Sequence, residues 1–229
     1  MGVIARLYED EYGPEFGSVV IRDDDPCGQF DDVDDGGLLG ESSGSLWGTV
    51  ARAGTGFLQL NATGSNQRVL IEAHDGEPGP ETEPWGDVVE TPYFCRTGFV
   101  HLTRTTGGTR HSWTAFPLGG PGHYRARVCR VAVGRGFDWT VRFWAAHLRL
   151  PAWLVRDPET FRPDTLDDDI YALASWSPLG RMTTTIDDLA GTLLVDLESV
   201  RAALTTSQHL TVAGQTRLTI QALSDEDLS

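Results

Sequence analysis

The sequence contains no lysine, only three cysteines and no long apolar run. All 18 basic side chains are arginines, they face 33 acidic residues, and the formal net charge is -15. An acidic surface repels phosphate backbones, so we expect a charged partner to be basic rather than a nucleic acid. No segment approaches the roughly 18 consecutive apolar residues that a membrane-spanning helix needs, so we expect no membrane span.

The cysteines and the N-terminal residues indicate the cellular setting. Cys27, Cys95 and Cys129 are isolated, and no CxxC spacing occurs. We therefore expect buried free thiols, without a disulfide framework or a structural zinc site. Residues 1–16 lack the basic and then apolar layout of a secretory signal, so we expect a cytoplasmic protein.

Residues 1–150 have the pattern of an antiparallel β-sandwich domain. Short segments rich in β-branched and apolar residues are separated by Gly, Ser and Asn turns, and no segment has a convincing helical period. These segments are 46–52, 56–62, 67–74, 85–95, 98–104, 112–116, 123–133 and 138–147. The connection at 75–86 is rich in proline and glycine, so we expect it to be extended.

The segment 123–133 alternates clearly between its two faces. Its apolar residues from Tyr124 to Val128 are expected on one side of the sheet, with Arg125, Arg127 and Cys129 on the other. The layout of 120–147, together with the sequence WGDVVE at 85–90, resembles small bacterial β-sandwich modules, including the competence-associated nuclease inhibitors. This resemblance implies a protein-binding role and brings no catalytic motif with it.

After residue 150 the pattern becomes helical. Residues 151–165 contain three prolines and are expected to form a linker packed on the first domain. Residues 166–222 are predicted to form three helices and then a hairpin around Ala213–Gly214, and residues 223–229 an acidic tail. The predicted N-caps of the three helices are Thr165, Thr185 and Asp196.

The sequence LAGTLLVDLESVRAAL resembles the helix-turn-helix of the winged-helix family. The residues that match its pattern are Leu189, Ala190, Leu193, Val195, Asp196, Val200 and Leu204. The turn position that the family usually fills with glycine is Leu194 here, and a bulky residue disfavours positive φ. The predicted fold class is therefore α+β, with an N-terminal antiparallel β-sandwich followed by a C-terminal winged-helix module.

The outward side chains of the second motif helix and of the hairpin form a candidate interaction surface. Its residues are Glu198, Ser199, Arg201, Ala202, Thr205 and Arg217. Three arginines and seven acidic residues give the segment 166–222 a net charge of -4. Each phosphate contact requires a cation, so this surface favours protein docking or dimerisation over DNA binding.

We find no motif for catalysis, a cofactor or a metal. Walker, HExxH and paired Cys/His patterns are absent. Four histidines lie on or near predicted strands, but the close His-x-His pair of a cupin-type metal site is missing. They are His101, His111, His123 and His147. We therefore predict a non-enzymatic protein without a cofactor or metal site.

The sequence leaves three functions open. The leading hypothesis is a regulatory or adaptor protein that binds another protein, more favourably a basic one, in a bacterial defence, competence or toxin-control system. The alternative is a sequence-specific DNA-binding transcriptional regulator whose β-sandwich senses a ligand or forms a homodimer. The third is an enzyme or small-molecule binder that uses the sandwich interior, and no motif favours it.

Overall fold

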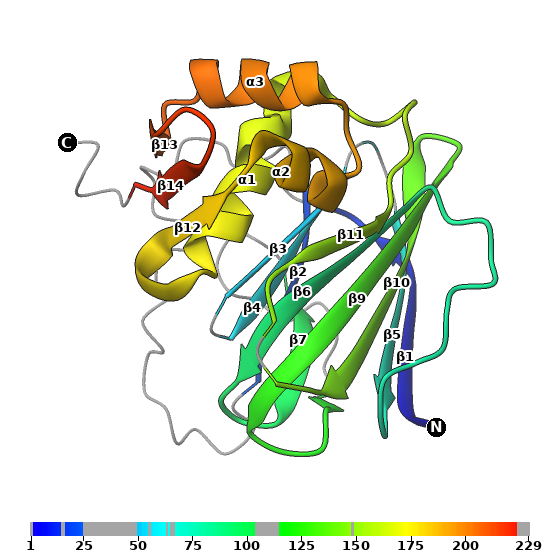
Figure 1. Ribbon diagram of the computed structural model, residues 1–229. Coiled ribbons are helices and arrows are strands. Elements are labelled where there is room, and N and C mark those ends of the chain that lie inside the picture. The colour runs from blue at the N-terminus through cyan, green and yellow to red at the C-terminus, as the bar shows by residue number, and fades with distance from the viewer. Residues whose placement is uncertain are drawn as a thin grey trace. The chain divides into compact units, whose positions relative to one another are not determined.

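The computed structural model describes residues 2–14, 17–24, 50–54, 56–62, 64, 67–103, 115–147 and 149–223 (Figure 1). Among these residues the chain divides into two compact units between Arg149 and Leu150. The first unit is built from strands, and the second contains the helices and a small sheet. The α+β class predicted from the sequence is confirmed. Within the described residues, no helix is long and apolar enough to cross a bilayer.

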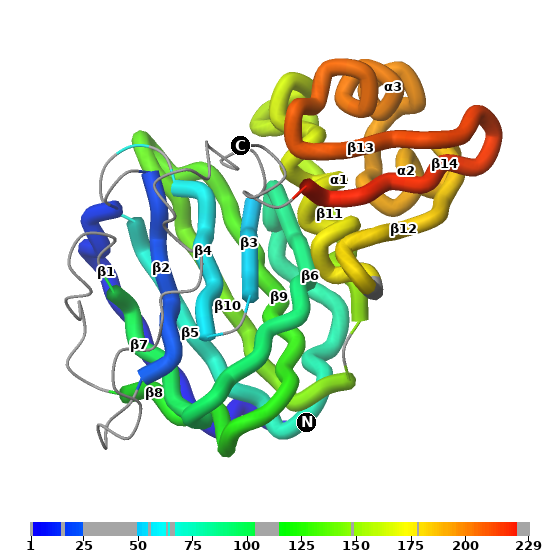
Figure 2. Tube along the Cα trace, turned by 90° about the vertical axis from the view of Figure 1, so that its left-hand side faces the viewer, coloured from blue at the N-terminus to red at the C-terminus, as the bar shows by residue number. Residues whose placement is uncertain are grey.

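The first unit consists of two sheets, which Figure 2 shows lying face to face. The strands have the bounds β1 Val3–Tyr12, β2 Ser18–Asp23, β3 Ala51–Gly54, β4 Phe57–Asn61, β5 Gln67–His74, β6 Asp87–Cys95, β7 Phe99–Thr103, β8 Phe116–Pro117, β9 Gly122–Val133 and β10 Gly136–Ala145. Within this unit, sheet A has the strand order β1-β5-β10-β9-β6, and sheet B has the order β3-β4-β2-β7-β8. The order is open in both sheets, so neither closes into a barrel.

Sheet A departs from the antiparallel arrangement predicted for residues 1–150. Strand β10 pairs antiparallel with β9, its neighbour in sequence, but parallel with β5, where Val141 lies opposite Ile71. The chain returns from β5 to β10 through β6, β7, β8 and β9, so no crossover helix is needed to bring the two strands into the same direction. Hydrophobic alternation reports which face a residue occupies and not the direction of the partner strand, so the sequence pattern missed this pair.

The core of the first unit lies between the two sheets. Alternate residues of β5 and β10 are buried on one face, and residues of β2, β4 and β7 meet them from sheet B. The fully buried apolar side chains of these strands include Val19, Ile21, Leu58, Leu60, Val69, Ile71, Val100, Leu102, Val141 and Phe143. Tyr93 of β6 packs edge-on against Phe143, with 5.3 Å between ring centroids.

Polar side chains complete this core at two points. The Gln67 carbonyl oxygen Oε1 accepts hydrogen bonds from the Phe137 backbone N–H and from the Trp139 indole N–H, both at 3.0 Å. The Tyr93 hydroxyl donates to Asp23 of sheet B at 2.5 Å and so joins the two sheets. Burial is the first cause of the raised pKa of Tyr93, which keeps the hydroxyl a donor at neutral pH.

The second unit combines short helices with a small sheet. Its elements are β11 Ala152–Val155, η1 Pro163–Thr165, α1 Leu166–Ser175, η2 Pro178–Gly180, β12 Arg181–Thr184, α2 Ile186–Leu193, α3 Leu197–Thr206, β13 Leu210–Ala213 and β14 Leu218–Ala222. Strand β14 lies in the middle of the small sheet and pairs antiparallel with β12 and β13. Gly214 begins the β13–β14 turn with φ 103°, and a Cβ there would lie 2.2 Å from the Arg217 carbonyl oxygen.

All three predicted N-cap residues stand at the helix starts, and two of them cap through a side-chain hydrogen bond. Thr185 accepts a hydrogen bond from the Asp188 N–H, and Asp196 accepts one from the Ser199 N–H. Thr165 is the N-cap residue of α1 as predicted, but its side chain does not cap the helix, because its hydroxyl donates to the Arg162 carbonyl. The 3-10 turn η1 runs directly into α1, so the Leu166 N–H already has a partner in the Pro163 carbonyl.

We predict that Gln67→Leu lowers the free energy of unfolding of the first unit by about 3 kcal/mol. The substitution leaves two buried donors without an acceptor, and each such loss costs about 1–3 kcal/mol. Urea denaturation measures the change. The matched control is Gln59→Leu, which removes one hydrogen bond to Ser18 from a half-buried residue and should cost about 1 kcal/mol. Equal losses in the two variants would contradict the prediction.

Candidate functional site

The sequence-predicted surface lies on the second unit, around α3. The residues exposed on this helix are Glu198, Arg201, Ala202 and Thr205. Ser199 is half-buried, and its hydroxyl donates to Asp196. Helix α3 turns Val200 and Ala203 inward, and this spacing of buried residues places the predicted surface outward.

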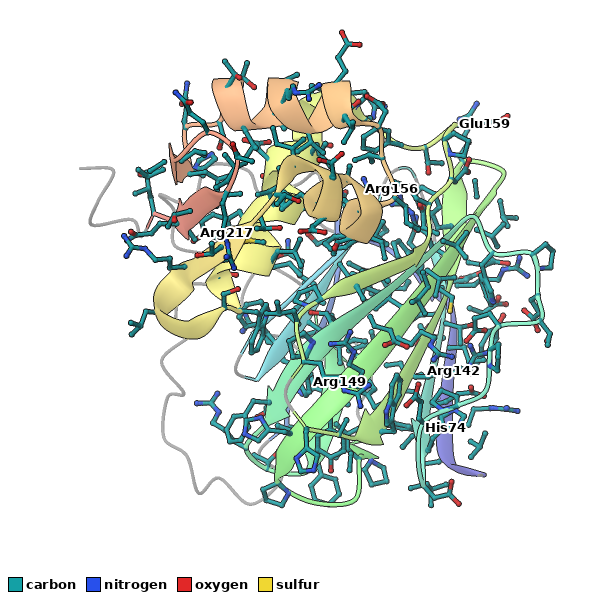
Figure 3. All side chains as sticks on the ribbon, in the orientation of Figure 1. His74, Arg142, Arg149, Arg156, Glu159 and Arg217 are labelled. Atoms are coloured by element: carbon teal, nitrogen blue, oxygen red, sulfur yellow. The ribbon has the colours of Figure 1, made fainter. Side chains whose placement is uncertain are left out.

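Arg217 lies apart from these residues in the chain, in the turn between β13 and β14, and Figure 3 labels it. Its side chain is exposed. In the described part of the chain, no hydrogen bond or ion pair joins Arg217 to a side chain of α3. Four of the predicted residues thus share the exposed side of α3, whereas Arg217 is an exposed cation of the β13–β14 turn.

The turn between α2 and α3 has the conformation that the sequence disfavoured. Leu194 adopts the left-handed region, with φ 56° and ψ 45°, at the position that winged-helix proteins usually fill with glycine. The Val195 N–H then bonds back to the Ala190 carbonyl and closes the end of α2. The Leu194 side chain remains 45% exposed, and the neighbouring Leu197 remains 37% exposed.

The first unit contains a second group of functional interest, which we call the charged face. Hydrogen bonds and ion pairs link its side chains across β1, β5, β6, β9, β10 and the 75–86 connection. Its members are Arg6, Glu72, His74, Glu81, Glu90, Arg125, Arg127 and Arg142. The predicted alternation of 123–133 is confirmed, because Ala126 and Val128 are fully buried while Arg125 and Arg127 bond to this group.

Arg127 is the most connected side chain of the charged face. Its Nε donates to Glu90 at 2.8 Å, and its Nη1 donates to the Gly79 carbonyl at 2.7 Å and to Glu81 at 3.2 Å. The guanidinium carbon lies 5.4 Å from the centroid of the Trp144 ring. The 75–86 connection has no strand or helix, and Arg127 holds its backbone against β9.

Arg142 and Glu72 extend the charged face toward β1. Arg142 donates to Glu72 at 2.9 Å and to Glu81 at 2.5 Å, and Arg6 donates to the other oxygen of Glu72 at 2.9 Å. Figure 3 labels Arg142 and His74, which lie on the neighbouring strands β10 and β5. Burial opposes ionisation of Glu72, but hydrogen bonds from Arg6, Arg142 and His74 outweigh it, so the pKa of this carboxyl is lowered.

The buried cysteines of the first unit are thiols that do not ionise at neutral pH. Cys95 and Cys129 are both free thiols, as predicted, and Cys27 lies outside the described residues. Burial raises the pKa of each of the two described thiols to about 12, so neither is a thiolate at neutral pH.

A pocket opens beside the charged face, and no sequence pattern indicated it. Its volume is about 220 Å³. Its lining residues are Glu77, Glu90, Arg125, Trp144, Ala145, Ala146, His147 and Arg149. They come from the 75–86 connection, β6, β9, β10 and the residues after β10, so a local pattern could not have grouped them.

The histidines singled out in the sequence lie at separate places. His101 of β7 lies 3.6 Å from Asp24, and His147 lines the pocket. His123 is the second residue of β9, with 4.8 Å between its ring centroid and that of Phe94. His111 lies outside the described residues. Within the described residues, no group of three or more His, Cys, Asp or Glu side chains is arranged to hold a metal ion.

These features define an α+β protein with a two-sheet unit, an exposed helical surface and a small polar pocket. No protein-family model matches the sequence, and no curated protein matches it. One similar solved structure is ComJ from Bacillus subtilis, an inhibitor of the DNA-degrading activity of NucA. It is 13% identical, with a TM-score of 0.38 over 63% of this chain and 98% of that chain. Another is a protein named as crocagin biosynthetic gene J. It is 11% identical, with a TM-score of 0.37 over 64% of this chain and all of that chain.

We predict that Glu72→Gln lowers the free energy of unfolding at pH 7 by about 2 kcal/mol, because it removes the carboxylate that accepts from Arg6 and Arg142 and leaves Glu81 as the remaining carboxylate on Arg142. The folded pKa of Glu72 lies below its ordinary value of 4.5. The carboxylate therefore stabilises the fold above that value, and its contribution is lost as the pH falls through the lowered pKa.

Chemical denaturation from pH 7 to pH 3 should accordingly show the gap between wild type and Glu72→Gln narrowing below about pH 4.5. Glu11→Gln, at an exposed position of β1, serves as the control and should change stability by less than about 0.5 kcal/mol. A gap that stays constant over the whole range would show that the carboxylate charge is not the stabilising feature.

Proposed function

We propose that this is a non-enzymatic regulatory or adaptor protein that acts by binding another protein, in a bacterial defence, competence or toxin-control system. The observation that carries the proposal is the conformation and exposure of Leu194. A left-handed backbone costs an L-residue about 1–2 kcal/mol, and glycine would avoid this cost. A leucine that is strained and still 45% exposed contributes little to the core, so its side chain is better explained by a contact with a partner.

The surroundings of Leu194 support a basic partner. Leu197 adds a second exposed apolar side chain, and Asp196 and Glu198 are exposed beside them. An apolar centre with a charged rim is the usual composition of a protein–protein interface. Because the rim is acidic, the complementary surface would present apolar side chains flanked by arginine or lysine.

The alternative function is a sequence-specific DNA-binding regulator, with the first unit as a sensing or dimerisation domain. The order of α1, β12, α2, α3, β13 and β14 favours it, since a winged helix has this order, and we propose that residues 166–222 form such a module. Arg201 on α3 and Arg217 in the wing turn are exposed cations that a phosphate backbone could use. Three exposed acidic residues on α2 and α3 argue against DNA binding, because they would repel phosphates. They are Asp187, Asp188 and Glu198.

A duplex DNA titration across a salt series separates the two functions. We expect no binding even at low salt, because each phosphate contact needs a cation and the 166–222 segment has a net negative charge. The measurement is fluorescence anisotropy with wild type and Arg201→Ala. Tight binding that weakens with salt and is lost in Arg201→Ala would establish the DNA function and refute the docking one.

Leu194→Gly tests the docking surface directly. Relief of the backbone strain offsets the loss of a half-exposed leucine, so stability should stay within about 1 kcal/mol of wild type. Proteins that co-purify with wild type from the source cells would be identified, purified and titrated with each variant by calorimetry. We expect Leu194→Gly to weaken the binding of such a partner at least tenfold.

The adjacent Leu193 provides the control, because its side chain is fully buried. Leu193→Ala should cost about 2–5 kcal/mol of stability through the cavity that it leaves. Arg181→Ala, at an exposed position in β12, should leave the affinity for the partner unchanged. If the purified partner binds Leu194→Gly as tightly as wild type, the α2–α3 turn is not the docking surface.

A homodimer remains a separate prediction that sedimentation equilibrium of wild type would decide.

A further inference from the structure

The pocket beside the charged face has a buried base and an exposed rim, and all its residues belong to the first unit. Arg125 and Trp144 are each 4% exposed. His147 and Arg149 are exposed at its edge, and Figure 3 labels Arg149. The pocket lies outside the core between the two sheets, so it differs from a ligand site in the sandwich interior.

The acceptors in the pocket are already engaged with arginines. One oxygen of Glu90 accepts from Arg125 at 3.1 Å, and the other accepts from Arg127 at 2.8 Å. Glu77 is 59% exposed at the rim, 4.0 Å from Arg127. A cationic ligand would therefore have to displace Arg125 or Arg127 to obtain a buried carboxylate.

The donors at the rim remain available. Among the described residues, the guanidinium of Arg149 and the ring of His147 have no hydrogen-bond or ion-pair partner, although the Arg149 carbonyl accepts from Arg125 at 2.8 Å. A guanidinium can donate two parallel hydrogen bonds to a carboxylate, and a histidine ring can supply a third donor. The unused hydrogen-bonding capacity of the pocket is thus suited to an anion.

The local electrostatics favour the same class of ligand. Burial is the first cause of the lowered pKa of Arg125, Glu90 opposes it, and the charge of Arg149 lowers the pKa further. Arg149 thus adds positive charge next to a guanidinium that is already desolvated. A negative charge placed between them would stabilise both. Glu77 and Glu90 would repel a doubly charged anion, so a single negative charge fits better than two.

The volume of the pocket and the residues that line it restrict the ligand further. A volume of about 220 Å³ corresponds to roughly seven water molecules at about 30 Å³ each. Trp144, Ala145 and Ala146 supply apolar surface next to the charged rim. This combination suits a small molecule with one carboxylate and a compact apolar body.

We propose that this pocket binds a small organic carboxylate, with the carboxylate on Arg149 and His147 and the apolar body against Trp144, Ala145 and Ala146. This site is independent of the docking surface on α3 and does not rest on the proposed function. It gives the first unit a ligand-binding role in addition to any role in partner binding.

Benzoate is the probe for this proposal, and the full-length protein is the sample. Two-dimensional NMR would follow the Trp144 indole N–H signal during the titration, and calorimetry would give the affinity. We expect a saturable shift in wild type and an affinity at least ten times weaker in Arg149→Ala. Arg135→Ala removes the same charge from an exposed position in the β9–β10 turn and should bind benzoate as wild type does.

Two further ligands test the chemistry of the pocket. Benzylammonium has the opposite charge on a similar body, and inorganic phosphate has a higher charge without an apolar part. We expect neither to produce a saturable Trp144 shift at concentrations that saturate with benzoate. The proposal is overturned if benzoate causes no saturable shift, if Arg149→Ala and Arg135→Ala bind it equally, or if benzylammonium or phosphate binds as tightly.

Discussion

The buried guanidinium of Arg127 is the group on which the geometry of the first unit's charged face depends. It is 5% exposed, and it binds β6 through Glu90 and the 75–86 connection through the Gly79 carbonyl and Glu81. Removing such an ion from water costs several kcal/mol, which is recovered only when its partners are present in good geometry. The connection, with its prolines and glycines, has no regular structure of its own. Its position against β9 therefore depends on this cation, together with the bonds from Arg142 to Glu81 and from the Gly86 N–H to the Arg130 carbonyl.

The parts of this arrangement that the sequence predicted are local ones. The alternation of 123–133 assigned Arg125 and Arg127 to one face correctly, because strand geometry fixes which residues share a side. It could not assign their partners, since Glu81 and Glu90 lie dozens of residues away and are selected by the fold of the whole unit. The strands β1 and β2 were not predicted from the sequence. The parallel pairing of β5 with β10 was also missed, because no local pattern reports which strands become neighbours. Strand order depends on the packing of the whole unit and not on any single segment.

In the second unit, too, the sequence predicted the features that depend on a few neighbouring residues and missed those that depend on packing. Thr185 and Asp196 were identified as caps because a side chain that accepts a hydrogen bond from the backbone two or three residues later is a local arrangement. Thr165 has the same residue type, but the preceding 3-10 turn had already satisfied the helix start. At Leu194 the residue preference argued against positive φ, and the chain adopts it nevertheless. Packing of α2 against α3 outweighs a local cost of about 1–2 kcal/mol.

The number of arginines, 18, does not by itself give the positive charge that a partner would meet. Many are paired with carboxylates within one unit, including Arg6, Arg68, Arg125, Arg127, Arg130, Arg142 and Arg156. The charge of each of these cations is already balanced by a carboxylate, so the number of arginines overstates how much positive charge a partner would meet.

The same reasoning distinguishes the two proposed sites. Around Leu194 the exposed charges are acidic and favour a basic protein surface, whereas at the pocket the buried acid Glu90 is already paired and Arg149 retains its charge. Opposite preferences on one acidic chain follow from which charges are neutralised locally, and total composition does not determine them. A partner for either surface is therefore better sought from the unpaired side chains at that surface than from the overall charge of the protein.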